Sequence, residues 1–298
     1  LGGLSQSIRH FEQAIAIDPG FALPYAGLAD AFIALGSYSY RTPREMLPQA
    51  GTLARKALAL DSTMAEAHTA LAEVQFNYDW DLVAAERSFQ RAIALKPGYR
   101  KAYDWYAQLL VATGREVEGI KTSVDAVPLN PLDTETYGSL ALVYYFAHQY
   151  DQAIEHCRKA LELDEAYFTA HVYLGLAYAQ KGMFGKAIPP LEAAVQLSGG
   201  SALVKSSLGY AYGLAGRDRE ARELLNELRA AAETQYVPAI SMAAIHMGLG
   251  ERDAVFKWLD KAYKERHHYL IFSKVEPMMD GLRSDPRFQA LLAKMNLD

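Results

Sequence analysis

The stretch FTAHVYLGLAYAQKGMFGKAIPPLEAAVQLSGGS, residues 168–201, decides the fold of this chain. Leu174 and Tyr178 are four residues apart, so they lie on one face of a helix. Gly175 has no side chain, so a neighbouring helix can approach closely beside them. Gly182 is placed to end the helix in a left-handed conformation. These residues predict a helix that packs tightly on one side and stops at Gly182.

A second helix is predicted directly after this turn. Ala187, Leu191 and Ala194 form a stripe at helical spacing. Pro189 and Pro190 fall inside that stripe, where we expect them to kink or delay the helix. Small and bulky side chains alternate on both helices, and one hairpin cannot bury its own apolar face. The stretch therefore predicts a hairpin that must stack on others like it.

The same pattern recurs along the chain. Residues equivalent to Leu174 follow one another at intervals of 35, 34, 34, 34 and 34 residues, and each precedes an alanine or a glycine: Leu71, Tyr106, Leu140, Leu174, Leu208 and Met242. Because several columns repeat in phase, we expect a row of stacked hairpins and not a closed globule.

These columns resemble the tetratricopeptide repeat family, in which each 34-residue unit is a helix, a tight turn and a second helix. The resemblance covers nearly the whole chain and implies an all-α, right-handed superhelix of about seven hairpins. We expect a repeat array over residues 1–267 and a capping segment at 268–298. The array divides into a leading half-repeat and seven repeats: 5–19, then about 22–64, 65–99, 100–133, 134–167, 168–201, 202–235 and 236–267.

Three places depart from the period or end it. Ala14 and Ala57 are 43 residues apart, nine more than one period, and we expect a long inter-helix loop at residues 36–43. One extra residue lies near residues 77–81. Asp285, or alternatively Ser284, is expected to cap a last helix, which would cover the final hairpin.

Composition excludes several classes of protein. Thirty Lys and Arg against 35 Asp and Glu give a net charge of −5, which argues against direct nucleic-acid binding. One cysteine, Cys157, excludes an internal disulfide and a zinc site of several cysteines, and we expect no cofactor and no metal. No apolar run is long enough to span a membrane. The start within a repeat suggests a piece of a longer protein, and the single cysteine suits the cytoplasm, with the periplasmic side as the alternative for a tethered regulator.

Catalytic motifs are missing, so we expect no enzyme. Cys157 is expected to be a small buried hydrophobe. The competing class is an α-helical toroid hydrolase that uses carboxylates such as Asp79 and Asp104. For the run Asp79-Trp80-Asp81, the alternative interpretation is structural: Asp81 caps a helix that begins near Leu82, and Trp80 packs on the edge of its repeat.

The resemblance also implies a binding surface, because ligands of the family usually lie on the concave face. In the family, fixed positions of each repeat point into this concave face. The residues of this chain at those positions are the candidates for binding a peptide or protein partner: Asp30, Glu66, Thr69, Glu73, Phe76, Lys101, Asp104, Gln108, Leu142, Tyr145, Val172, Leu176, Tyr210 and Met247. Acidic residues dominate the N-terminal half of this groove, and apolar and aromatic residues dominate the other half. We expect a scaffold that presents this groove to a protein or peptide segment with basic and apolar residues.

Two alternatives stay open within binding. The first is a receptor for a small ligand or peptide, with an enclosed pocket between Tyr145 and Tyr210. The second concerns assembly: the half-repeat at residues 5–19 could stack on another copy and form an end-to-end homodimer.

A narrower resemblance concerns one bacterial subgroup of these repeats. It rests on segments such as Leu28-Ala29-Asp30 and residues 78–81, 197–200, 236–238 and 282–288. They resemble the C-terminal regions of multidomain signalling proteins, where the repeats follow a winged-helix domain, a Ser/Thr kinase or a nucleotide cyclase. The resemblance implies a sensory or regulatory module of a bacterial signalling protein.

Overall fold

The computed structural model describes residues 2–297, which contain α-helices, one π-helical turn and short 3-10 helices, and no strand. This confirms the all-α prediction. The helices are α1 Gly2–Ile17, α2 Ala22–Ser37, α3 Pro43–Leu60, α4 Ala65–Val74, η1 Gln75–Asp79, α5 Leu82–Leu95, α6 Arg100–Ala112, α7 Glu116–Ala126, η2 Val127–Leu129, α8 Thr134–Phe146, α9 Tyr150–Leu163, α10 Phe168–Gln180, α11 Phe184–Leu197, α12 Ala202–Leu214, α13 Asp218–Ala231, α14 Ala239–Gly248, α15 Arg252–Glu265, η3 His268–Phe272, η4 Pro277–Leu282 and α16 Pro286–Ala293.

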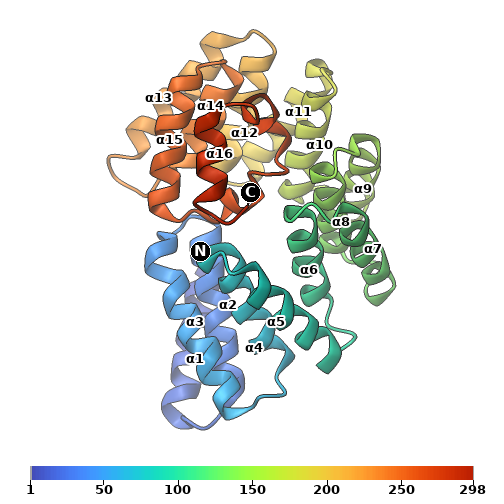
Figure 1. Cartoon of the computed structure of the whole chain (residues 1–298), viewed down its shortest axis with the longest axis vertical. Helices are drawn as coiled ribbons and strands as arrows, with labels where there is room; N and C mark the ends of the chain where they lie inside the picture. The colour runs from blue at the N-terminus through green and yellow to red at the C-terminus, as the bar shows by residue number, and fades with distance from the viewer. Residues whose placement is uncertain (1, 298) are drawn as a thin grey trace.

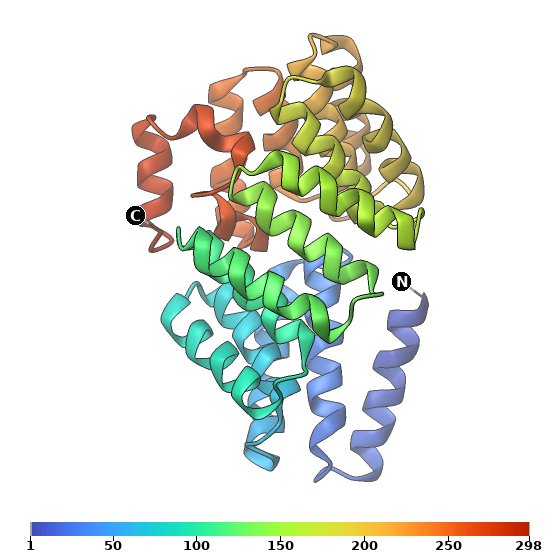
Figure 2. The same ribbon diagram turned by 90° about the vertical axis from the view of Figure 1, so that its right-hand side faces the viewer.

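Successive helices pack as hairpins that coil into a right-handed superhelix, as predicted (Figure 1). The chain rises from α1–α5 through α6–α11 and then turns back, so that α15 and α16 lie above the N-terminal hairpins (Figures 1 and 2). At Gly182 the backbone has a φ of +69°, which ends α10 in the predicted left-handed conformation. Among residues 2–297, no helix is long and apolar enough to cross a membrane.

The extra residue near position 77 is absorbed by a change of helix type. The chain winds more widely in the π-helical turn η1, and Trp80 then takes a left-handed conformation with a φ of +58°. A π-turn is the usual way to fit one more residue into a helix without ending it. The Asp81 side chain accepts a hydrogen bond from the Ala84 amide and caps α5, as predicted.

Two expectations about irregularities were wrong. The nine surplus residues do not make a long loop, because α2 and α3 are 16 and 18 residues long where α10 and α11 have 13 and 14. Only residues 38–42 are left between α2 and α3. The prolines Pro189 and Pro190 do not delay α11, which begins at Phe184, so this half of the expectation was wrong. Pro189 is exposed, so the amide hydrogen bond that it cannot make is lost on an open side of the helix.

The C-terminal segment, residues 268–297, reaches beyond the last hairpin. Asp285 caps α16 as predicted, and the buried Phe288 anchors it. The first turn of this segment, η3, enters the concave side of the superhelix. There the Phe272 ring stacks on Phe146 at 4.7 Å between centroids and meets Phe76 edge-on at 5.7 Å. The segment therefore fills the middle of the groove and is part of the main core.

A second contact joins the two ends of the superhelix; we call Tyr78, Trp80, Tyr263 and Arg266 the clasp. The Arg266 guanidinium donates to the Tyr78 carbonyl, 188 residues away, and lies 4.4 Å from the Trp80 ring. Trp80 and Tyr263 have ring centroids 5.4 Å apart. Sequence reasoning placed Trp80 on the edge of its own repeat and did not foresee this contact, which forms because the return of the superhelix brings α15 against it.

Candidate functional site

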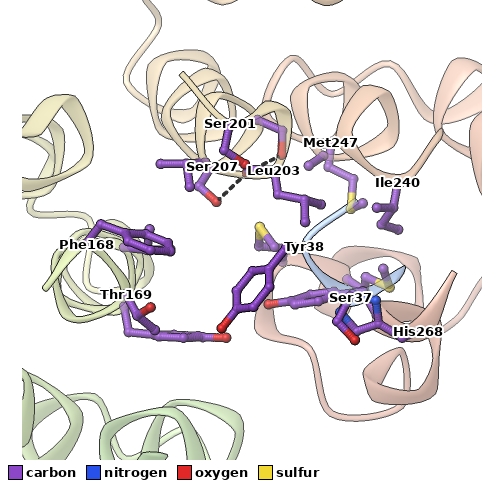
Figure 3. A pocket seen from close by; sticks show the side chains of 18 residues that line it. Ser37, Tyr38, Phe168, Thr169, Ser201, Leu203, Ser207, Ile240, Met247 and His268 are labelled. Atoms are coloured by element: carbon purple, nitrogen blue, oxygen red, sulfur yellow. Dashed lines mark hydrogen bonds between the residues drawn. The ribbon is translucent and has the colours of Figure 1, made fainter. Parts of the chain in front are cut away.

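Two adjoining cavities open on the concave side. The charged cavity, of about 420 Å3, is lined by Asp30, Glu73, Arg100, Lys101, Asp104 and Glu135. The apolar cavity, of about 210 Å3, is lined by Phe168, Val172, Leu203, Ile240, Met247 and Met279 (Figure 3). Ser37, Tyr38 and Thr169 line both cavities, so they form the wall between them.

Lys101 lies between two carboxylates of the charged cavity. Its Nζ is 3.0 Å from Asp30 Oδ1 and 2.6 Å from Glu73 Oε1. Only 1% of the Glu73 side chain is exposed, and this burial raises the pKa of Glu73 to about 7 against the opposing pull of Lys101. One cation thus serves two acids, one of which has no contact with water.

Arg100 has a similar role one residue earlier. It forms ion pairs with Asp104, with Asp133 at 3.0 Å and with Glu135 at 2.8 Å. Burial raises the pKa of Asp104 to about 7, although Arg100 opposes the rise. Each basic residue of this cavity is already paired with acids of the same chain, and the acids are in surplus. The cavity is therefore suited to a cationic group and not to an anion.

The apolar cavity gathers side chains from four parts of the fold. Phe168 and Val172 come from α10, Leu203 from α12, Met247 from α14 and Met279 from the C-terminal segment. The hydroxyls of Ser206 and Ser207, which also line it, donate to the Leu203 carbonyl. Because these hydroxyls are satisfied internally, the cavity offers mainly apolar contact.

Tyr38 comes from the loop between α2 and α3 and points into the apolar cavity (Figure 3). It lines the charged cavity as well. Sixty per cent of its surface is exposed. Sequence reasoning missed Tyr38 because the repeat columns do not extend to the end of the lengthened helix α2, where Tyr38 lies. The nine surplus residues were the signal, since they show that this hairpin differs from the others.

The structure brings eight of the fourteen predicted residues to these cavities. Asp30, Glu73, Lys101, Asp104, Gln108 and Leu142 line the charged cavity, and Val172 and Met247 line the apolar one. Lys101 is the one basic residue among the fourteen that the repeat period predicted for the groove. Arg100 was missed because it lies one position before the repeat position that the family pattern assigns to the groove.

The other six predicted residues lie outside both cavities. Glu66 forms an ion pair with Lys96 at 2.6 Å, and the Thr69 hydroxyl donates to the Ala65 carbonyl. Leu176 is buried, and Tyr210 accepts a hydrogen bond from Gln180. The remaining two, Phe76 and Tyr145, are completely buried.

The C-terminal segment explains the burial of Phe76 and Tyr145. Phe272 covers Phe76, and the Tyr145 hydroxyl donates to Glu276 Oε1 at 2.9 Å. A partner cannot reach either residue while the segment is in place. The apolar cavity also differs from the pocket expected between Tyr145 and Tyr210, because neither of these tyrosines lines it.

The carboxylates named for a hydrolase do not converge. Asp104 lines the charged cavity, whereas Asp79 lies in η1 and does not line it. Cys157 is buried, and burial raises the pKa of its thiol. In residues 2–297, no group of three or more His, Cys, Asp or Glu side chains is placed to hold a metal ion.

Comparison with known proteins supports a tetratricopeptide repeat protein. The model of the tetratricopeptide repeat matches residues 134–167. Anaphase-promoting complex subunit 7 of Dictyostelium discoideum is 31% identical over 110 residues, which are 37% of this chain and 19% of that protein. BBSome complex member BBS4 of Bos taurus is 25% identical over 60% of this chain and 34% of its own length. The matched segments are thus at most about a third of these relatives.

A solved structure agrees with the fold. A chain of the human IFIT1 dimer with m7Gppp-AAAA superposes with a TM-score of 0.65 at 19% identity, over 92% of this chain and 68% of that one. At this identity the likeness concerns the fold alone. The architecture is that of a tetratricopeptide solenoid, and such proteins are in general non-catalytic scaffolds for protein interaction.

Proposed function

We propose that this chain is a non-enzymatic interaction module that binds a segment of a protein or peptide on its concave side. One observation carries the proposal: two adjoining cavities, one with surplus carboxylates and one apolar, open where the repeat phase places ligand-binding residues. Cavities with an apolar wall and a few polar groups are the usual form of a binding site.

The chemistry of the cavities favours a partner with basic and apolar residues. Surplus carboxylates attract a cationic side chain and steer its approach. An apolar side chain that enters the second cavity loses contact with water and supplies much of the affinity. A nucleic acid does not fit the charged cavity, because its phosphates would meet carboxylates and the cations there are already paired.

The proposal includes a setting, the sensory or regulatory part of a bacterial cytoplasmic signalling protein. Its support is the resemblance of segments such as residues 282–288 to that subgroup. The curated relatives described above come from a slime mould and a mammal, so they add nothing to this setting. The coding sequence on either side of the part that encodes residues 1–298 tests it, because an output domain in the same chain is expected there.

Peptide display tests the binding function. Random peptides panned against the folded chain should be enriched in sequences that combine Lys or Arg with a large apolar residue. Glu135→Gln should then weaken binding several-fold and reduce its dependence on salt, because Glu135 lines the charged cavity and 68% of its side chain is exposed.

Glu118→Gln is the matched control. Glu118 is 59% exposed and also pairs with an arginine, Arg115, but it lies on α7 outside the cavity. Enrichment of acidic peptides, or equal effects of both substitutions, would contradict the proposal.

A small apolar ligand is a second candidate. The apolar cavity, of about 210 Å3, exceeds the roughly 150 Å3 of an engineered apolar cavity that binds benzene. A rise in melting temperature with indole, abolished by Val172→Trp, would support this role.

A further inference from the structure

Three residues line both cavities, and Tyr38 has the largest side chain among them. Tyr38, flanked by Ser37 and Thr169, lines both cavities. Its neighbour in the loop, Tyr40, has its ring centroid 6.3 Å from that of Tyr38 but lines neither cavity. A ligand that occupies both cavities must therefore pass over Tyr38.

The two cavities demand different groups. In the charged cavity, Lys101 pairs with both Asp30 and Glu73. Arg100 pairs with both Asp104 and the more exposed Glu135. The carboxylates therefore outnumber the basic groups, and an added cation would give the surplus acids a partner. The apolar cavity has room for a group somewhat larger than benzene. The side chains of Phe and Trp are of that size.

The geometry of an extended peptide fixes the spacing between these two groups. Neighbouring side chains point to opposite sides, whereas side chains two positions apart point to the same side, roughly 7 Å from each other. One tyrosine side chain fits between such a pair. Adjacent residues cannot both point into the groove, and residues four apart lie roughly 13 Å from each other, too far to straddle one ring.

We propose, as a deepening of the proposed function, that the occupant is an extended segment with a large apolar residue and a Lys or Arg two positions apart. The apolar side chain enters the apolar cavity, the cation enters the charged cavity, and the backbone passes over Tyr38. Tyr38 is the residue that determines the spacing.

Binding of labelled peptides tests this directly. Blocked Gly-Ser peptides carry one Trp and one Lys with zero, one or three residues between them, in both orders, and fluorescence anisotropy gives their affinities. The peptide with one intervening residue should bind about tenfold more tightly than the others in one of the two orders. Replacing its Lys by Glu should abolish binding, and added salt should weaken it.

Two variants of the loop test the role of Tyr38. Tyr38→Ala joins the two cavities, so the preference for spacing should fall below about twofold, while Tyr40→Ala should keep it. Circular dichroism of both variants verifies that the superhelix is folded.

The possible failures are distinct. Equal affinity at every spacing, or a preference that survives Tyr38→Ala, overturns the spacing inference and leaves the binding function standing. If none of the basic apolar peptides binds at millimolar concentration, the proposed function fails as well.

Discussion

Gly175 of α10 faces the backbone of α11 at very short range. A Cβ at this position would lie 2.4 Å from Leu191 Cγ and 2.8 Å from the Ala187 carbonyl oxygen. The Leu191 side chain can move, but the carbonyl belongs to the partner helix. The close approach that the sequence predicted beside Gly175 is therefore made by α11, the second helix of the same hairpin.

Gly175→Ala should destabilise the chain by up to roughly 2 kcal/mol, because an overpacking cost of about 1–3 kcal/mol is offset in part by a gain of about 1 kcal/mol in helix propensity. The free energy of unfolding in urea measures the change. Gly185→Ala is the control, since that glycine lies in α11 and a Cβ there meets nothing within 4 Å. It should be neutral or slightly stabilising, and equal losses in both variants would contradict the packing argument.

At the scale of elements, the C-terminal segment contains a buried acid, Glu276. Burial raises its pKa to about 7, although Tyr145 and the Met278 amide donate hydrogen bonds to it. In the unfolded chain an ordinary glutamate has a pKa near 4.3. Between these two values the folded state holds more protons than the unfolded state, so the contribution of Glu276 to stability is largest below pH 4 and is lost as pH rises to about 7.

Glu276→Gln should remove this dependence. The neutral amide can still accept from Tyr145, so stability at pH 8 should be equal or higher than in the parent, and the decline between pH 5 and pH 7 should be smaller. Urea unfolding at several pH values measures both. Glu233→Gln, at an exposed site after α13, should leave the profile unchanged. An unaltered decline in Glu276→Gln would show that other acids, such as Glu73, cause it.

Sequence could predict the elements themselves because their signals are local. The columns around Leu174, the turn at Gly182 and the caps Asp81 and Asp285 each depend on residues within a few positions. Cys157 is likewise buried where its column predicted a small hydrophobe. Eight of the fourteen groove residues that the repeat period predicted line the two cavities, since residues at a fixed place in each repeat share one face.

The rest depended on contacts across the superhelix, which no local pattern records. The C-terminal segment covers Phe76 and Tyr145 from a place far along the chain, with Glu276 131 residues from Tyr145. Tyr38 reaches Phe168 and Leu203 only because the superhelix curves. These features depend on the small rotation between repeats, and sequence periodicity does not give its size.

At the scale of the whole molecule, the clasp joins the first hairpins to the last. Arg266 carries much of it, since its guanidinium contacts Trp80 and Tyr78 together. Arg266→Ala should cost about 1–3 kcal/mol, from the loss of the cation–π contact and of a hydrogen bond made by a charged group.

Hydrogen exchange can detect the loss of the clasp at a distance. In Arg266→Ala, amides of residues 78–81 should exchange faster, although the substitution lies on another hairpin. Arg219→Ala is the control, because Arg219 is 81% exposed and its one ion pair, with Glu223, is within α13. Unchanged exchange at residues 78–81 would show that the clasp contributes nothing to holding the ends together.

The clasp also changes how the molecule responds to tension. A row of hairpins that touch only their neighbours extends like a spring, one unit after another. Here the segment from α5 to α15 is closed into a loop by the contact between Arg266 and Tyr78 and by the Phe272–Phe76 ring pair. A pull on the two ends stretches this segment only after those contacts part, whereas α1–α3, which lie outside the loop, carry the load from the start. The hairpins within the loop would therefore separate abruptly above a threshold force, where an untied solenoid would yield gradually.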